Sequence, residues 1–173
     1  MIATLFGVLL AVTLSNAENL KKEKSDTIKL LKSARNIVSG TYAYTDVLGN
    51  YATELKNDST KSQSALKSFE TNNPLPYPEF IEPIISSEII SKNITENSHA
   101  KIYTSLINLK KISLYQSIDL YKNKLNYLFD LVTLEIEYQK GNISLTELNN
   151  EDGSNIDMPP VSALDKEYRI DSH

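Results

Sequence analysis

Apolar side chains recur at helical spacing through the region 98–140 of this chain. One series steps alternately by four and three residues, which is typical of a helix packed against another helix. Its members are Leu114, Ile118, Tyr121, Leu125, Leu128 and Val132. The pattern predicts one long helix over this region, and we expect the rest of the fold to be arranged around it.

A second series of the same kind lies in the region 19–56. Its members are Leu30, Ala34, Ile37, Thr41, Tyr44, Leu48, Tyr51 and Leu55. It predicts a helix of roughly 57 Å at 1.5 Å per residue. Between the two series, prolines alternate with other residues over 72–78, which excludes a helix there and predicts a short reversal of the chain. The two long helices should therefore pack antiparallel.

The remaining segments predict short helices only. We expect one over 62–70 and another that begins at Pro83 and continues through Ile90, ending in the polar stretch 92–97. Glycine is scarce and strand-like alternation is nowhere sustained. The predicted fold class is all-α, an antiparallel helical bundle or hairpin built on two long heptad-patterned helices.

The first seventeen residues read as a secretory signal peptide. An apolar run from Ile2 to Leu14 is followed by small residues that end at Ala17, and the run is shorter than the ~20 residues needed to span a bilayer. We expect cleavage before Glu18 and no membrane span in the mature chain. The predicted organisation is a signal peptide over 1–17, a helical bundle over 18–148 and an acidic tail over 149–173.

The tail accounts for the whole net charge of −4. It holds six acidic and two basic residues, and with its glycine and two prolines we expect it to be disordered. The helical body is neutral, and we expect no nucleic-acid partner because no basic cluster is evident along the sequence. The short run Lys21–Lys24 is read as a solvated helix start. The absence of cysteine means that the fold depends on apolar packing alone.

No constellation of residues predicts an enzyme. Glu96 and His99 have the spacing found in di-iron bundles, but the only other histidine is His173, so no second half of such a site exists in the sequence. Glu135 and Glu137 are read as solvated acids. We expect no catalytic residues, no metal and no cofactor.

A second apolar stripe lies beside the first on the long helix over 98–140. It consists of Leu120, Tyr127, Leu131, Leu134 and Tyr138. The short helices are too small to cover it, so we expect part of it to stay exposed. We expect Leu131, Leu134 and Tyr138 to bind a protein partner or a second copy of the chain.

The end of this helix carries strong local signals. Gly141 is suited to terminate a helix, and Ser144 with Glu147 forms a capping box that predicts a further helical turn. The run 138–148, at the end of a heptad helix, resembles the helix ends of outer-membrane efflux proteins of the TolC type. That resemblance implies a helical hairpin from such a channel, as a minor alternative, and it assigns no functional residue.

The sequence therefore predicts a secreted, non-enzymatic protein that acts through protein–protein contact in a structural, adhesive or effector-like role. An extracellular carrier with an apolar ligand between its helices is the alternative. The expected location is extracellular, or periplasmic in a bacterium. Sequons at Asn57, Asn93 and Asn142 occur about as often as chance predicts, so they decide nothing about the host or about glycosylation.

Overall fold

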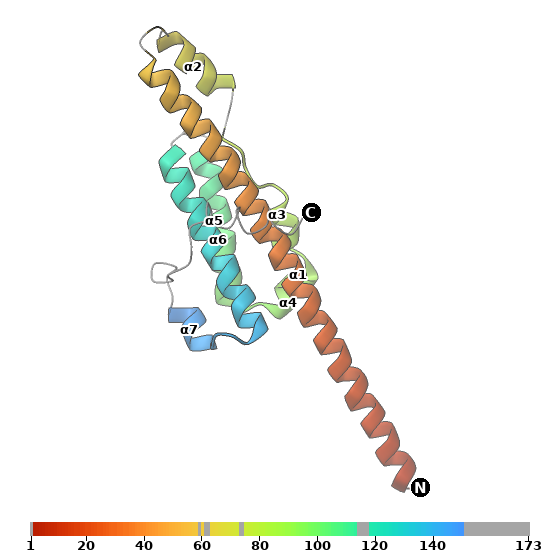
Figure 1. Cartoon of the computed structure of the whole chain (residues 1–173). Helices are drawn as coiled ribbons and strands as arrows, with labels where there is room; N and C mark the ends of the chain where they lie inside the picture. Colours follow the sequence, from red (N-terminus) through yellow and green to blue (C-terminus); the bar gives the residue numbers. More distant parts are fainter. Residues whose placement is uncertain (1, 59, 61–62, 73–74, 114–117, 151–173) are drawn as a thin grey trace, which may run out of the picture.

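A computed structural model describes residues 2–58, 60, 63–72, 75–113 and 118–150 (Figure 1). All regular structure within these ranges is helical, as the sequence predicts. The helices are α1 (Ile2–Asn57), α2 (Gln63–Asn72), α3 (Ile81–Ile85), α4 (Glu88–Asn93), α5 (Glu96–Ser113), α6 (Ile118–Lys140) and α7 (Leu145–Asn150). The acidic tail beyond residue 150 lies outside the described residues.

Helices α1 and α6 pack against each other along the length of the bundle (Figure 1). Near the C-terminal end of α1, Asp46 accepts a hydrogen bond from Lys122 close to the start of α6. Further toward the N-terminus, the Arg35 guanidinium lies 5.9 Å from the centre of the Phe129 ring. Positions fall along α1 as they rise along α6, so the two helices run antiparallel, as predicted.

The predicted single helix over 98–140 is wrong. The chain forms α5 and α6 instead, with a break after Ser113, and the two helices pack side by side as a hairpin (Figure 1). Leu114, which opened the predicted series, lies outside the described residues. Heptad spacing tells which residues face a core, and a hairpin whose two helices face one core satisfies the same spacing as one long helix.

One hydrophobic core joins α1, α3, α4, α5 and α6. Its fully buried side chains include Leu31, Ala34, Val38, Ile81, Ile85, Ile90, Ile102, Leu109, Tyr121, Leu125, Leu128, Val132 and Ile136. The predicted series on α6 supplies the centre of this core. On α1 the predicted series is buried or half-buried except at Tyr44 and Tyr51, which are about half exposed.

The predicted reversal of the chain at the prolines is wrong, because α2 already folds back on α1, with the centre of the Phe69 ring 4.7 Å from that of Tyr51. The proline connection then packs against the bundle. Leu75 and Pro78 are buried, and the hydroxyl of the fully buried Tyr121 donates a hydrogen bond to the carbonyl oxygen of Pro76. The helix predicted to begin at Pro83 is instead two short helices separated at Ser86 and Ser87. The Ser87 side chain accepts a hydrogen bond from the backbone of Ile90 and so caps α4, which stops α3 from continuing.

The predicted end of α6 is confirmed in detail. Gly141 has φ +83°, and its N–H donates to the carbonyl oxygen of Tyr138. The N–H of Asn142 donates to the carbonyl oxygen of Glu137, which completes the pattern of a Schellman motif. The Ser144 N–H donates to the Glu147 carboxylate at 2.6 Å, and the Glu147 N–H donates to the Ser144 hydroxyl at 3.2 Å. This capping box starts α7.

Two glycines inside α1 have different surroundings. A methyl group added at Gly49 would lie 3.1 Å from a methyl carbon of Ile118, whereas one added at Gly40 would meet nothing within 4 Å. The lack of a side chain at Gly49 therefore allows the start of α6 to approach α1 closely.

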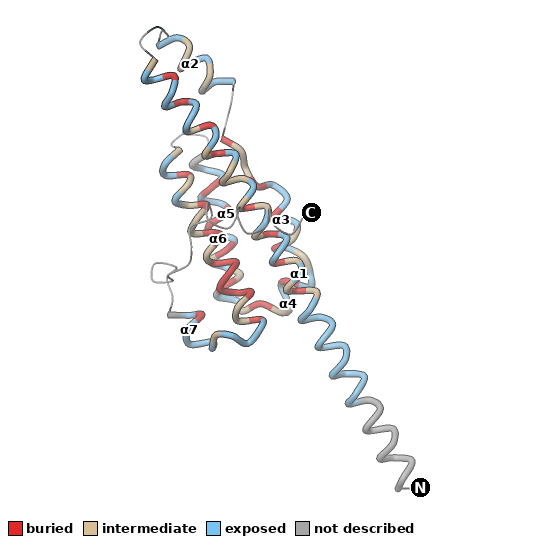
Figure 2. Tube along the Cα trace, viewed as in Figure 1, coloured by how far each residue is buried: buried red, intermediate tan, exposed pale blue. Residues whose placement is uncertain are grey.

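The N-terminal part of α1 extends beyond the bundle (Figure 2). Every residue from Thr13 to Ser25 is exposed, and burial begins at Thr27. None of the helices in the described part of the chain is long and apolar enough to cross a membrane.

Candidate functional site

The second apolar stripe of α6 is only partly exposed. Leu120 is 45% exposed and Tyr127 and Tyr138 are half-buried, but Leu131 and Leu134 are 6% and 3% exposed. The expectation that Leu131 and Leu134 form an exposed contact surface is therefore wrong.

The reason lies in the number of neighbours that α6 has. It packs against α1, α5 and also α7, and all six residues from Leu131 to Ile136 are buried. A helix with neighbours on every side buries residues that an amphipathic helix would expose. The prediction that short helices could not cover this stripe overlooked the hairpin partner α5 and the packing of α7.

A groove lined by lysines lies where α1 leaves the bundle and α6 ends, and we call it the lysine groove. It has a volume of about 500 Å³. It is lined by Lys21, Lys24, Ser25, Ile28, Lys29, Lys32, Gln139 and Lys140. Five of these eight residues are lysines and none is acidic, so the groove carries a concentrated positive charge.

Two of the five lysines are already paired. Lys29 contacts Asp26 at 3.0 Å and Lys140 contacts Glu137 at 2.5 Å. Lys21, Lys24 and Lys32 form no ion pair with a described residue. These three recur on one face of α1, and their ammonium groups are available to an acidic partner.

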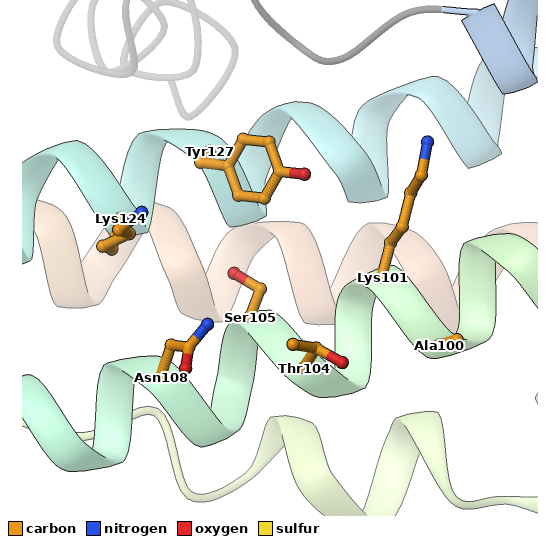
Figure 3. Close-up of a pocket in the computed structure, with 7 residues that line it drawn as sticks. All are labelled: Ala100, Lys101, Thr104, Ser105, Asn108, Lys124 and Tyr127. Atoms are coloured by element: carbon orange, nitrogen blue, oxygen red, sulfur yellow. The ribbon is translucent and has the colours of Figure 1, made fainter.

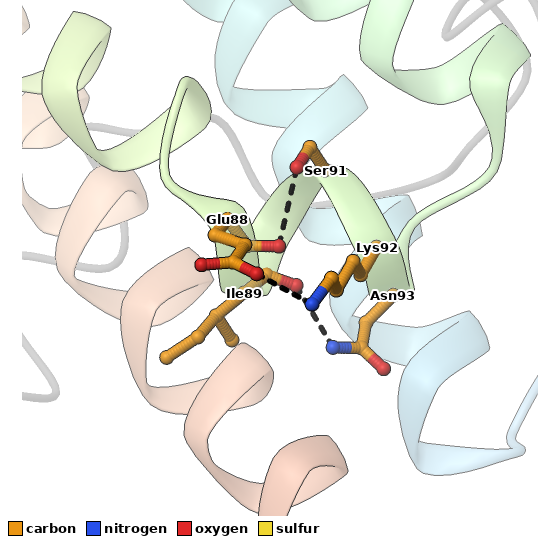
Figure 4. A network of polar contacts seen from close by, with 5 residues as sticks. All are labelled: Glu88, Ile89, Ser91, Lys92 and Asn93. Atoms are coloured by element: carbon orange, nitrogen blue, oxygen red, sulfur yellow. Dashed lines mark hydrogen bonds and ion pairs between the residues drawn. The ribbon is translucent and has the colours of Figure 1, made fainter.

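Helix α4 carries a polar network of its own. Figure 4 shows it, with the Lys92 ammonium group beside the Glu88 carboxylate. The pKa of Lys92 is raised, mainly by its hydrogen bond with Glu88 and to a lesser degree by the charge of Glu23.

Sequence reasoning missed this groove. The run Lys21–Lys24 by itself predicts only a solvated helix start, and Lys140 lies more than a hundred positions away in the chain. The available signal was the recurrence of lysine at 21, 24 and 32 on one helical face. These lysines line a groove only because the end of α6 lies beside them.

A second groove lies between α5 and α6 and has a volume of about 310 Å³. Figure 3 shows its lining. The lining residues are Ala100, Lys101, Thr104, Ser105, Asn108, Lys124 and Tyr127. We call it the donor groove, because six of the seven side chains carry an N–H or O–H donor and none is acidic. Tyr127 is the one residue of the predicted stripe that lines it.

Glu135 is fully buried, contrary to the expectation of a solvated acid. Its Oε1 accepts a hydrogen bond from Gln139 at 2.8 Å, and its Oε2 has no hydrogen-bond partner within the described residues. Burial raises the pKa of this carboxyl group, although its contacts with Gln139 and Ser98 act in the opposite direction. Gln139 also donates to the carbonyl of Asn93, so the network ties α6 to the end of α4.

His99, which has the spacing to Glu96 found in di-iron bundles, makes a structural contact. The His99 Nε2 lies 3.1 Å from the carbonyl oxygen of Ile85, which joins α5 to the end of α3, and Glu96 is exposed. Within the described residues, no three of the side chains that commonly bind metals come together.

Comparison with protein-family models, with curated proteins and with solved structures finds no match for this chain. The resemblance of 138–148 to efflux proteins therefore has no support beyond its local pattern, which the Schellman motif and the capping box produce by themselves.

Proposed function

We propose that this chain is a secreted, non-enzymatic helical protein that acts through protein–protein contact, and that the lysine groove receives an acidic segment of its partner. The observation that carries this proposal is the cluster of Lys21, Lys24 and Lys32, unpaired and on one face of a helix that extends from the bundle. An extended acidic segment suits a groove that is open and already formed by two rigid helices.

The half-buried Ile28 adds apolar contact between the lysines. Charged groups at an exposed surface give modest affinity individually, on the order of 0.2–1 kcal/mol per pair. Three such pairs contribute about 0.6–3 kcal/mol together, so we expect a weak complex whose affinity falls as the salt concentration rises.

The alternative of an apolar carrier has less to support it. The donor groove is lined mainly by polar and basic side chains, which offer little to a ligand without polar groups.

A direct test measures binding of a fluorescent ten-residue glutamate peptide to the full chain by anisotropy at low salt. Saturable binding is expected, and the triple variant Lys21→Glu, Lys24→Glu and Lys32→Glu should weaken it about tenfold or more. The variant leaves every core residue in place, so its helical circular dichroism should match the parent.

The matched control places the same three charge reversals at Lys56, Lys67 and Lys111, which are exposed and lie outside the lysine groove. Peptide binding should survive in this control. Equal losses in both triple variants would show that net charge alone attracts the peptide and would refute the groove. Binding of a polyphosphate but not of the peptide would refute an acidic protein partner.

A further inference from the structure

The polar side chains of the donor groove share one chemical property. They supply two ammonium groups, three hydroxyl groups and one amide, from Lys101, Lys124, Thr104, Ser105, Tyr127 and Asn108. Neither lysine forms an ion pair with a described residue. A ligand that suits this lining is anionic and rich in hydrogen-bond acceptors.

Ser105 provides an independent indication of a ligand. Its side chain is 3% exposed, and its Oγ has no hydrogen-bond partner within the described residues. Figure 3 shows this hydroxyl between α5 and α6, on the side of Tyr127. A buried hydroxyl without a partner costs about 1–3 kcal/mol, so an acceptor that reached Ser105 would recover part of that cost.

The two positive charges lie toward opposite ends of the groove. Lys124 lies beside Asn108, whereas Lys101 is seven residues earlier on α5, about 10 Å along the helix axis (Figure 3). Ser105 and Tyr127 lie between them. Charge at both ends and hydroxyl groups in the middle match a ligand that carries an acidic group at each end.

We propose that the donor groove binds a small ligand with two separate acidic groups, called a dianion here whatever the charge of each group. One acidic group lies at Lys101, the other at Lys124, and an acceptor oxygen lies at Ser105. A volume of about 310 Å³ accommodates a short dicarboxylate or a sugar bisphosphate. This site lies across α6 from α1 and is independent of the contact proposed for the lysine groove.

The test is a titration of the ¹⁵N-labelled full chain, followed by amide chemical shifts, with three probes: glutarate, fructose 1,6-bisphosphate and acetate. We expect saturable shifts around Ser105 and Tyr127 with at least one dianion, and weaker binding of acetate. The arms with glutarate and the bisphosphate distinguish a carboxylate ligand from a phosphate ligand.

Three variants test whether the ligand binds in the donor groove. Lys101→Gln and Lys124→Gln should each weaken the dianion about fivefold, because each removes one partly exposed ion pair. Ser105→Ala should also weaken it while the helix remains intact. Lys111→Gln removes the same charge from α5 outside the groove and should leave the affinity unchanged.

Four results would overturn the proposal. They are an absence of saturable shifts with both dianions, equal affinity for acetate, an equal loss in Lys111→Gln, and no effect of Ser105→Ala. The first shows that the groove binds neither a dicarboxylate nor a bisphosphate. The second and third show that any positive surface suffices, and the fourth shows that the anion does not reach the buried hydroxyl.

Discussion

Replacing Leu131 and Leu134 together by glutamate separates the exposed stripe expected from the sequence from the buried position seen in the structure. An exposed stripe predicts that the variant keeps its helices and loses only a binding partner. The structure predicts that it unfolds, since these side chains are only 6% and 3% exposed.

The size of the effect follows from this burial. Truncating a buried leucine to alanine costs about 2–5 kcal/mol, and glutamate adds the cost of desolvating a charge. Two such substitutions together remove most of the free energy of unfolding, which is roughly 5–15 kcal/mol for a domain of this kind. The double variant should therefore lose most of its helical circular dichroism at 25 °C and neutral pH.

The matched control is Leu120→Glu with Leu145→Glu, because both leucines are nearly half exposed, at 45% and 47%. This variant should keep the parental spectrum and lose less than about 2 kcal/mol in urea titration. Single Leu131→Ala gives a graded measurement, with an expected loss of about 2–4 kcal/mol. If the Leu131 and Leu134 double variant melts within a few degrees of the parent, the burial of this stripe by α5 and α7 is wrong.

Four further substitutions test individual contacts by urea unfolding. Glu135→Gln should stabilise the fold at neutral and alkaline pH, because the raised pKa of Glu135 means that the native state loses stability as this carboxyl group ionises. The gain in stability should vanish below the ordinary carboxyl pKa, and a gain that persists in acid would contradict this cause. Gly40→Ala should stabilise by about 0.5–1 kcal/mol, and Gly49→Ala should gain clearly less because its methyl group meets α6, so equal gains would exclude a close approach. Tyr121→Phe should cost about 0.5–1.5 kcal/mol by removing the hydrogen bond to Pro76, and a neutral result would mean that this bond is not formed.

Features encoded within a few residues could be predicted from the sequence. Gly141 and the pair Ser144 and Glu147 carry their own hydrogen-bond partners within one or two turns, so the end of α6 and the start of α7 follow without knowledge of the rest of the fold. The burial of Leu125 and Leu128 follows from their spacing in the same way.

Features that depend on the arrangement of helices could not be predicted. The break after Ser113 leaves the apolar spacing unchanged, so the pattern cannot distinguish one helix from a hairpin. Glu135 was assigned to the surface by its charge, but its burial depends on the ends of α4 and α5 lying beside α6. The lysine groove needs Lys32 and Lys140 side by side, which only the antiparallel register of α1 and α6 provides.

From the position of α6 we expect that both proposed grooves can be altered without loss of the fold. The six residues from Leu131 to Ile136 are buried among neighbouring helices, so substitutions there change the packing of the core. Lys124 and Lys140, in contrast, lie at the margins of α6, where it meets α5 on one side and α1 on the other. Their ammonium groups reach solvent while their aliphatic stems cover the helix, so a change of charge at either margin removes an interaction and little packing. Loss of binding in such variants, with the helical spectrum retained, therefore reports on the groove itself.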